Sequence, residues 1–348
     1  MKARSSYDLL SWYEKEHREL PWRKTKEPYM IWLSEIIMQQ TRVDQGMSYY
    51  FKFLELFPTV HDLAKAKESE VLNAWQGLGY YSRGRNLHHS AKRIVEEFDG
   101  MFPDNYNSLL SLKGVGPYTA AAISSICFNE QRAVVDGNVE RFISRRFGVK
   151  EAVNESKGKK IIAEYANEMI PSDRPGDHNQ AMMEMGATVC TPKKPKCGEC
   201  IFNGNCFALK NDLINELPLK TKKTKVKDRN INYLVCQFQD ELLMQERREK
   251  DIWLGLHDFP NSLSNKKEYD RQLGKQNYAF VGEAVRMIHI LSHQKLNVSF
   301  QKVMIDEKSK VQIDGIWQDP KGIESTPIPR LIEKYLVENH TDLVDQKI

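Results

Sequence analysis

Hydrophobic residues recur at helical spacing over about the first 215 positions and at strand spacing after about position 230. The first part contains long segments with apolar residues three or four positions apart, at 29–41, 70–98 and 178–190, separated by Gly, Pro and Asn turns. Such spacing places the apolar residues on one face of a helix. We therefore predict a helical first part, without the alternation of strands and helices that builds a parallel sheet.

In the second part the apolar runs are shorter and have a different spacing. Short apolar runs at 232–238, 241–247 and 295–305 predict strands, because they are brief and rich in strand-forming residues. The pattern at 329–339 predicts one late helix. This part is therefore predicted to be a smaller α+β domain.

A basic stretch separates the two parts. Between positions 220 and 229 the chain has five lysines and Arg229 against the single acid Asp228, and a Pro-containing segment precedes them. Such a charge run is typical of a solvated linker. The predicted organisation is mainly α, with a helical domain at 1–215, a basic linker at 216–229 and the α+β domain at 230–348.

Composition limits the class of protein. With 348 residues, 41% of them hydrophobic, the chain can build a core for each of two domains. No apolar run approaches the length of a membrane span, and positions 1–10 do not resemble a secretory segment, so a cytoplasmic protein without a membrane partner is expected. The net charge of +4 permits a nucleic-acid partner without requiring one.

Four of the six cysteines form the pattern C-x6-C-x2-C-x5-C, at Cys190, Cys197, Cys200 and Cys206. Four thiolates can bind zinc or hold an iron–sulfur cluster. Zinc ribbons usually pair two close C-x2-C motifs, whereas here one close pair is flanked by two unequal arms, so the spacing favours a [4Fe-4S] cluster over zinc. Two disulfides would need an oxidising compartment.

A Gly-x-Gly turn lies within residues 109–126. Gly114 and Gly116 bracket Val115, and Pro117 occupies a first helical position, where its missing N–H is tolerated. Such a turn leaves backbone N–H groups free to bind a phosphate at the start of the helix. Packing of one helix on the next would explain the same turn.

Two carboxylates stand in unusual surroundings. Glu35 lies among apolar residues of its predicted helix, where desolvation raises the pKa of a carboxyl group and suits it to act as a general acid. Its head could equally reach solvent or an arginine. Asp136 follows a short β-branched run and precedes a helix, so an N-cap or turn role is the plain alternative.

These motifs together resemble a known superfamily. Residues 112–123 resemble the helix–hairpin–helix of the DNA glycosylases that include endonuclease III, 134–142 resemble the aspartate loop that follows it, and the cysteine spacing is similar to their iron–sulfur loop. Within the superfamily, 20–41 and 77–88 resemble the adenine DNA glycosylases, which remove adenine mispaired with 8-oxoguanine. The resemblance runs from about residue 7 to 210 and is looser over the last 120 residues.

The resemblance implies a two-lobed glycosylase domain and assigns its chemistry. Glu35 would protonate adenine at N7, and Asp136 would stabilise the cationic sugar, either electrostatically or through a covalent adduct. Asn138 and Tyr118 would complete the sugar pocket. Relatives that also cut the strand have a lysine at the position of Tyr118, so this chain is expected to be a monofunctional glycosylase that leaves an abasic site.

The resemblance also implies DNA contacts, because a base must be flipped out of the duplex before it can react. Gln40 and Tyr80 would wedge into the stack, with Thr41 and Leu78 near the orphaned base. The adenine pocket would be lined by Trp22, Arg23 and Gln180. Core packing is the alternative for Trp22, Leu78 and Tyr80, and Arg83 and Arg85 are predicted to contact phosphates or to be structural.

Residues 251–260 resemble the opening motif of the Nudix-like domain that recognises 8-oxoguanine in these enzymes. A true Nudix hydrolase box is not found, so pyrophosphate hydrolysis is not expected. Where the family has Phe-Ser-His, this chain has Leu291, Ser292 and His293. Ser292 and His293 can still hydrogen-bond to a lesion, but the phenyl group is lost; a plain turn between strands is the alternative.

The implied partner is double-stranded DNA containing adenine opposite 8-oxoguanine or guanine, bound by a monomer. The implied cluster would brace a loop carrying Lys193, Lys194 and Lys196 against the phosphate backbone. Two other functions are consistent with parts of the pattern: a thymine or uracil mismatch glycosylase, and a noncatalytic iron–sulfur DNA-binding module. Glu35 and Asp136 argue against the second, because binding alone needs no acid.

Overall fold

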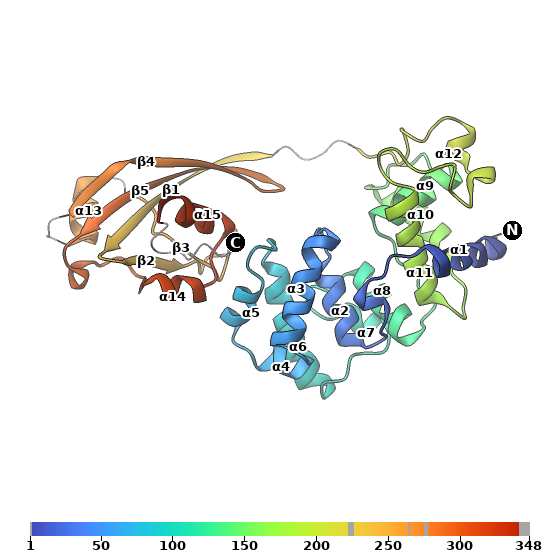
Figure 1. Cartoon of the computed structure of the whole chain (residues 1–348), viewed down its shortest axis with the longest axis horizontal. Coiled ribbons are helices and arrows are strands. Elements are labelled where there is room, and N and C mark those ends of the chain that lie inside the picture. The colour runs from blue at the N-terminus through green and yellow to red at the C-terminus, as the bar shows by residue number, and fades with distance from the viewer. Residues whose placement is uncertain (1, 222–225, 264, 275–277, 341–348) are drawn as a thin grey trace. The chain divides into compact units, whose positions relative to one another are not determined.

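The computed structural model describes residues 2–221, 226–263, 265–274 and 278–340 (Figure 1). The chain forms two compact units. The first comprises Met1–Lys65 and Asn86–Lys222, and the second comprises Ala66–Arg85 and Lys223–Ile348. Three lysines of the predicted linker, Lys222, Lys223 and Lys225, lie outside the described residues.

The first unit is helical, which confirms the prediction. Its helices are α1 (Lys2–Glu16), α2 (Pro28–Ile37), α3 (Val43–Leu56), α4 (Val60–Lys65), α6 (Ser82–Phe98, which begins in the second unit), α7 (Tyr106–Leu110), α8 (Pro117–Phe128), α9 (Gly137–Phe147), α10 (Ser156–Met169), α11 (Pro175–Glu184) and α12 (Phe207–Lys210). A 3₁₀ turn at Pro21–Arg23 precedes α2, and a π-helical turn at Met185–Val189 follows α11. Among the described residues, no helix is both long enough and apolar enough to span a membrane.

Helix α8 is the central helix of this unit, and α2, α7 and α11 pack against it. It is buried all round because its middle consists of small and aliphatic residues, Thr119–Ile126. Gly176 at the start of α11 comes so close that an added Cβ would lie 2.7 Å from the Cα of Ile126. A second core joins α1, α9, α10 and α11 around Leu9, Phe142 and Ile162. These cores fix the first turns of α8 and α9, where the predicted site residues lie.

The second unit is built on one sheet and contains helix α5 (Glu68–Ala74) from its early segment. Its strands and remaining helices are β1 (Lys227–Phe238), β2 (Glu241–Glu246), β3 (His257–Asp258), α13 (Lys266–Gln272), β4 (Tyr278–Ile290), β5 (Gln294–Ile305), β6 (Ile316–Gln318), α14 (Pro320–Ser325) and α15 (Arg330–Asn339). The strand order is β3-β2-β1-β5-β4, with β6 beside β2, and β1 and β5 run parallel (Figure 1).

The sheet has a core on each side. In β1, Tyr233 and Val235 face a core shared with α15, whereas Leu234 and Cys236 face a second core, as the two-residue period of a strand requires. The strands predicted near 232–238, 241–247 and 295–305 and the late helix are confirmed. Strand β4 was not predicted, because a register shift between Val281 and Val285 interrupts its alternation.

The predicted domain boundaries differ from the structure in two places. Ala66–Arg85 belongs to the second unit, because its side chains hydrogen-bond to distant backbone carbonyls there: Asn73 Nδ2 lies 3.0 Å from Ser325 O, and Tyr81 Oη 3.2 Å from Ile328 O. The predicted linker is also too long at its end, since Lys227–Arg229 already pair with β5 as the first residues of β1.

Candidate active site and cysteine loop

Glu35 lies on the apolar helix α2 with a half-buried side chain. Its carboxyl group is hydrogen-bonded to the Tyr118 hydroxyl and lies within electrostatic reach of Asp136 and Arg23. Burial raises the pKa of Glu35 to about 7; the Tyr118 hydrogen bond opposes this shift and the charge of Asp136 adds to it. The structure thus brings Glu35, Tyr118 and Asp136 together from α2, α8 and the start of α9.

Tyr118 sits in the first turn of α8, directly after the Gly-x-Gly turn. Burial and the nearby charge of Glu35 raise the pKa of its phenol well above its ordinary range. Its hydroxyl also lies 3.3 Å from Met183 Sδ on α11. The phenol therefore stays protonated near neutral pH and can donate a hydrogen bond to Glu35.

Of the two glycine positions in the turn, one requires glycine and the other does not. Gly114 has φ +83°, and an added Cβ would lie 2.7 Å from the Asn86 Cβ, so only glycine fits. Gly116 is the N-cap of α8 with ordinary extended backbone, and an added Cβ would meet no atom within 4 Å. The surface beside Gly116 is therefore open, at a helix N-terminus that can bind a phosphate.

Asp136 is the N-cap residue of α9. Its Oδ1 accepts hydrogen bonds from the backbone N–H groups of Asn138 at 2.9 Å and Val139 at 2.8 Å, and its Oδ2 accepts one from Asn138 Nδ2 at 2.7 Å. Three N–H donors thus orient the carboxylate and stabilise its negative charge. The N-cap role and a role beside a sugar cation are compatible, because the cap leaves the charge in place.

Arg141, which was not predicted from the sequence, holds the loop around Asp136 and Asn138 in place. Its guanidinium is buried and donates to Asn138 Oδ1 at 2.9 Å, to Gly186 O at 2.7 Å and to Cys190 O at 2.7 Å. Gly186, in the π-helical turn, is needed for close approach, since an added Cβ would lie 2.6 Å from the Asn138 Cβ. The Asp136 loop, the π-helical turn and the first cysteine are therefore one connected assembly.

Arg23 and Gln180 are linked through Tyr13. The Arg23 guanidinium lies 5.4 Å from the centroid of the Tyr13 ring, and the Tyr13 hydroxyl donates to Gln180 Oε1 at 3.0 Å. Both side chains line a cavity of about 230 Å³. Trp22, the third predicted residue of the adenine pocket, does not line this cavity but packs edge-on against Tyr50 with a centroid distance of 5.3 Å.

Glu184 is the residue that fixes Arg23. It is fully buried on α11 and accepts hydrogen bonds from Arg23 Nη2 at 2.7 Å and from Arg18 Nε at 2.8 Å. Burial alone would raise its pKa, but the hydrogen bonds from Arg18 and Arg23 lower the pKa of Glu184 to about 2. An acid within the apolar run at 181–185 was the available signal for this residue in the sequence.

The predicted wedge residues lie in different units. Gln40 and Thr41 follow α2 in the first unit, and Gln40 is exposed with φ +56°. Tyr80 in the second unit is 46% exposed with φ +46°, whereas Leu78 is only 7% exposed. Core packing therefore describes Leu78 but not Tyr80. Two non-glycine residues with positive φ at predicted contact positions agree with the tendency of such backbone to occur at functional sites.

Arg83 and Arg85 have protein partners. Arg83 is buried and donates to the carbonyl oxygens of Leu78 and Gly79, each at 3.1 Å, and burial lowers the pKa of its guanidinium to about 10. Arg85 donates to the carbonyl oxygen of Leu254. These contacts favour the structural alternative for both arginines over phosphate binding.

Ser292 and His293 are exposed at the turn between β4 and β5, and Leu291 packs against the core. Both polar residues line a cavity of about 570 Å³ within the second unit, together with Leu78 and Tyr80. The structure thus brings together three residues that were predicted to lie near the base opposite the adenine, Leu78, Ser292 and His293, and the predicted wedge residue Tyr80.

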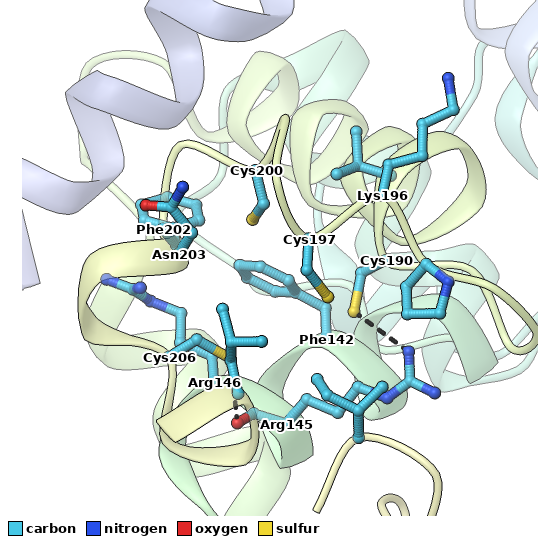
Figure 2. A pocket seen from close by; sticks show the side chains of 14 residues that line it. Phe142, Arg145, Arg146, Cys190, Lys196, Cys197, Cys200, Phe202, Asn203 and Cys206 are labelled. Carbon is cyan, nitrogen blue, oxygen red and sulfur yellow. Dashed lines mark hydrogen bonds between the residues drawn. The ribbon is translucent and has the colours of Figure 1, made fainter. Parts of the chain in front are cut away.

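The four cysteines of the loop surround one cavity, with their sulfur atoms directed into it (Figure 2). Apolar side chains, including Phe142, Val189 and Phe202, line the rest. Arg145 Nη1 lies 3.6 Å from Cys190 Sγ, and Arg145 and Arg146 are both buried. Four cysteine sulfur atoms in an apolar cavity beside two buried cations fit a [4Fe-4S] cluster, whose thiolate-ligated form is anionic.

Three models of known protein families match segments of this chain. The model of the HhH-GPD superfamily base excision DNA repair proteins matches residues 33–171, that of the NUDIX domain matches 232–338, and that of the iron–sulfur binding domain of endonuclease III matches 190–206.

Individual relatives cover more of the chain. The chain is 33% identical to the adenine DNA glycosylase of Buchnera aphidicola subsp. Schizaphis graminum, over 94% of this chain and 96% of that protein. It is 43% identical to the adenine DNA glycosylase of Homo sapiens over 58% of this chain and 38% of that one. Among solved structures, a thermostable thymine-DNA glycosylase superposes with a TM-score of 0.56 at 29% identity, over 60% of this chain and 97% of that one.

Proposed function

The chain belongs to the adenine DNA glycosylases of the HhH-GPD superfamily, and we propose that it hydrolyses the N-glycosidic bond of adenine opposite 8-oxoguanine or guanine, leaving an abasic site. One observation supports the chemistry most strongly: the carboxyl group of Glu35 has a pKa of about 7 and lies within hydrogen-bonding or electrostatic reach of Tyr118 and Asp136. A carboxylic acid with this pKa is partly protonated near neutral pH, as a general acid must be.

The two carboxylates take opposite roles in this proposal. Protonated Glu35 donates its proton to the departing adenine, so that the C1′–N9 bond breaks and the purine leaves neutral. Asp136, oriented by the N–H donors of Asn138 and Val139, faces the positive charge that develops on the sugar. Ionised Glu35 then accepts a proton from the water whose oxygen bonds to C1′, which restores the acid.

Tyr118 supports a reaction without strand cleavage. Strand cleavage by this superfamily requires an amine that forms a Schiff base with C1′. The phenol of Tyr118 occupies the corresponding position, and its pKa is raised well above its ordinary range by burial and by Glu35. We therefore infer that the enzyme is monofunctional, and that borohydride traps no covalent adduct.

Arg23 and Gln180 are the proposed adenine contacts, because both line one cavity and Glu184 and Tyr13 hold them in place. The cysteine loop holds a [4Fe-4S] cluster, which supplies a structural cross-link to the exposed loop that carries Lys193, Lys194 and Lys196. A duplex carries its mispair once, so one copy of the chain is sufficient, and we propose that it acts as a monomer on the genome in the cytoplasm.

The decisive experiment is incubation of the full chain with duplexes that contain A opposite 8-oxoguanine, A opposite G, A opposite T, T opposite G or U opposite G, followed by alkali cleavage at abasic sites. Release from the first two alone is the expected result. Release from T·G or U·G alone would instead assign the chain the activity of the thymine-DNA glycosylase that it resembles in structure. A Glu35→Gln variant is expected to bind the A·8-oxoguanine duplex and release no base.

A further inference from the structure

Met183 on α11 contacts the active-site residue Tyr118 through its sulfur atom. The Tyr118 hydroxyl donates a hydrogen bond to Met183 Sδ at 3.3 Å. Both side chains are half-buried. A thioether is a weak acceptor in water, but a hydrogen bond gains strength where the surroundings are less polar than water. The contact therefore has electrostatic consequences that simple packing would not have.

The Tyr118 hydroxyl has a second partner, the carboxyl group of Glu35. A phenol carries one hydrogen, so it donates to one of these two acceptors at a time, while its oxygen can accept a further hydrogen bond. Ionised Glu35 takes the phenol hydrogen, because hydrogen bonds to a carboxylate are the stronger kind. Protonated Glu35 has a hydrogen of its own to donate. Tyr118 can then accept that hydrogen and donate its own to Met183, which makes two hydrogen bonds in place of one.

The segment around Met183 is fixed on both sides of the α11 terminus. The next residue, Glu184, is fully buried and accepts a hydrogen bond from Arg23 Nη2 at 2.7 Å. In the π-helical turn that follows, Gly186 lies so close to Asn138 that an added Cβ would be 2.6 Å from the Asn138 Cβ. Met183 itself packs against the core that joins α1, α9, α10 and α11. The sulfur atom is therefore held beside the hydroxyl, next to a kind of turn that is frequent at functional sites.

We propose that Met183 is a positioning residue for the general acid: its Sδ atom accepts the phenol hydrogen of Tyr118 when Glu35 is protonated, so that the Tyr118 oxygen can accept and orient the carboxyl hydrogen of Glu35. The consequence for catalysis rests on the proposed function. The hydrogen-bond chain from Glu35 through Tyr118 to Met183 belongs to the free protein and can be measured without DNA.

The direction of the effect follows from the two protonation states. Met183→Leu removes one hydrogen bond from the protonated state of Glu35 and none from the ionised state, so it lowers the pKa of Glu35. The charged and titratable groups that act on the Glu35 carboxyl group come from three neighbouring elements, and the substitution leaves all of them in place. They are Tyr118 and Cys127 on α8, Asp136 at the start of α9 and Arg23 in the 3₁₀ turn before α2.

The test is a titration of the Glu35 carboxyl carbon by ¹³C NMR in the full chain without DNA, with the signal assigned by its loss in Glu35→Gln. The parent should titrate near pH 7, and Met183→Leu should titrate about half a pH unit lower, the size expected for one weak hydrogen bond. The fall of kcat/KM with rising pH, on a duplex with A opposite 8-oxoguanine, should move by the same amount, because it reports the free enzyme.

Met182→Leu is the matched control. Met182 precedes Met183 on α11, is 2% exposed and packs in the core. The same substitution there should cost comparable stability and leave the titration of Glu35 unchanged. A second comparison uses the Tyr118→Phe background, in which Met183→Leu should cause no further shift, because the sulfur acts only through the phenol.

The inference is wrong if Met183→Leu titrates with the parent, if Met182→Leu shifts the titration equally, or if the shift persists in Tyr118→Phe. Met183→Ile also lacks the sulfur and serves if Met183→Leu does not fold. Adenine release by the parent is a separate readout. A parent that releases no adenine from either duplex, together with the expected NMR shift, would overturn the proposed function and leave the hydrogen-bond chain standing.

Discussion

The Arg141 guanidinium donates a hydrogen bond to the carbonyl oxygen of Cys190 at 2.7 Å, which joins the first cysteine of the loop to the segment that carries Asp136. The same guanidinium donates to Asn138 Oδ1 at 2.9 Å, and Asn138 Nδ2 in turn donates to Asp136 Oδ2 at 2.7 Å. The cysteine loop is therefore linked by hydrogen bonds to the carboxylate that is proposed to face the sugar.

Replacing Arg141 with methionine removes these donors and preserves much of the apolar stem. The Asp136 loop then loses its support, and adenine release in a single turnover should slow by roughly 10–100-fold, because small displacements of a reacting group have effects of this size. Arg145→Met is the control, since Arg145 contacts Cys190 Sγ and not Asn138. It should lower iron content more than Arg141→Met does. The rate of adenine release is then divided by the fraction of protein that holds a cluster. If this corrected rate falls equally in both variants, the role given to Arg141 is wrong.

The dependence of rate on pH should report Glu35. Because the pKa of Glu35 in the free enzyme is about 7, kcat/KM should fall about ten-fold per pH unit above that value, as the acid loses its proton. The fall is measured from pH 6 to 9 on a duplex with A opposite 8-oxoguanine. A flat profile over that range would exclude Glu35 as the proton donor.

The same pKa predicts an effect on stability. Folding raises the pKa of Glu35 from 4.5, so its contribution to the free energy of unfolding is full below about pH 4.5 and is lost as the pH rises to about 7. Glu35→Gln cannot ionise, and should exceed the parent in free energy of unfolding by about 1–3 kcal/mol at pH 8. The difference, measured by urea denaturation, should shrink towards pH 4.

Local sequence was sufficient to place Glu35 on an apolar helix, Asp136 directly before a helix, and the Gly-x-Gly turn and the cysteine cluster in the chain, because each signal lies within a few residues of its cause. The catalytic roles of the two carboxylates came from the family resemblance instead. An acid among isoleucines or an aspartate before a helix is visible without knowledge of the fold. The helical first part, the late helix α15 and three of the strands were predictable for the same reason, since burial on one face sets their hydrophobic period. Helices α13 and α14 of the second unit were not predicted.

Long-range pairings were not predictable in this way. Glu184 meets Arg18 and Arg23 across more than 160 positions, and neither arginine indicates its partner in sequence. The segment Ala66–Arg85 joins the second unit through contacts such as Asn73 to Ser325, 252 positions apart. A change in residue pattern marks where helical spacing gives way to strand spacing. It cannot show that an earlier segment packs with a later one.

Glu184 should be one of the most costly polar residues to replace. Glu184→Gln leaves the largely buried guanidinium of Arg23 and the more exposed one of Arg18 without a counterion, and should lower the free energy of unfolding by about 3–5 kcal/mol at pH 7. Because its pKa is lowered to about 2, its contribution is present above about pH 4.5 and is lost as the pH falls towards 2, so the two proteins should converge in acid. Urea denaturation at pH 7 and pH 3 measures this.

The exposed pair of Glu14 and Arg174 provides the comparison, with a Glu14 Oε1 to Arg174 Nη1 distance of 2.6 Å. Glu14→Gln should cost less than about 1 kcal/mol, because solvent screens exposed pairs. If Glu14→Gln and Glu184→Gln lower the free energy of unfolding by similar amounts, burial does not make the ion pairs of Glu184 more stabilising than an exposed pair.

The lysines of the cysteine loop should contribute to DNA affinity through phosphates alone. Alanine at Lys193, Lys194 or Lys196 is expected to reduce the slope of log affinity against log salt by about 1 for each charge removed, equally for all sequences. Fluorescence anisotropy from 50 to 300 mM salt measures the slope, and Lys160→Ala on α10 is the control. If the slope is unchanged in all three variants, the cysteine loop does not contact the DNA.

The two glycines of the hairpin allow folding and DNA binding to be separated. Gly114→Ala forces a Cβ against Asn86 at φ +83°, and should lower the free energy of unfolding by about 1–3 kcal/mol. Gly116→Ala meets no protein atom and keeps an allowed backbone, so its stability should stay within about 0.5 kcal/mol of the parent.

Gly116→Ala should nevertheless weaken binding to duplex DNA, because its new methyl group occupies the open surface at the N-terminus of α8 where a phosphate would bind. The loss should be similar for duplexes with and without a mispair, since phosphate contacts carry no sequence information. Thermal unfolding and anisotropy on both duplexes give the comparison. Full DNA affinity in a stable Gly116→Ala protein would show that the phosphate backbone does not approach this turn.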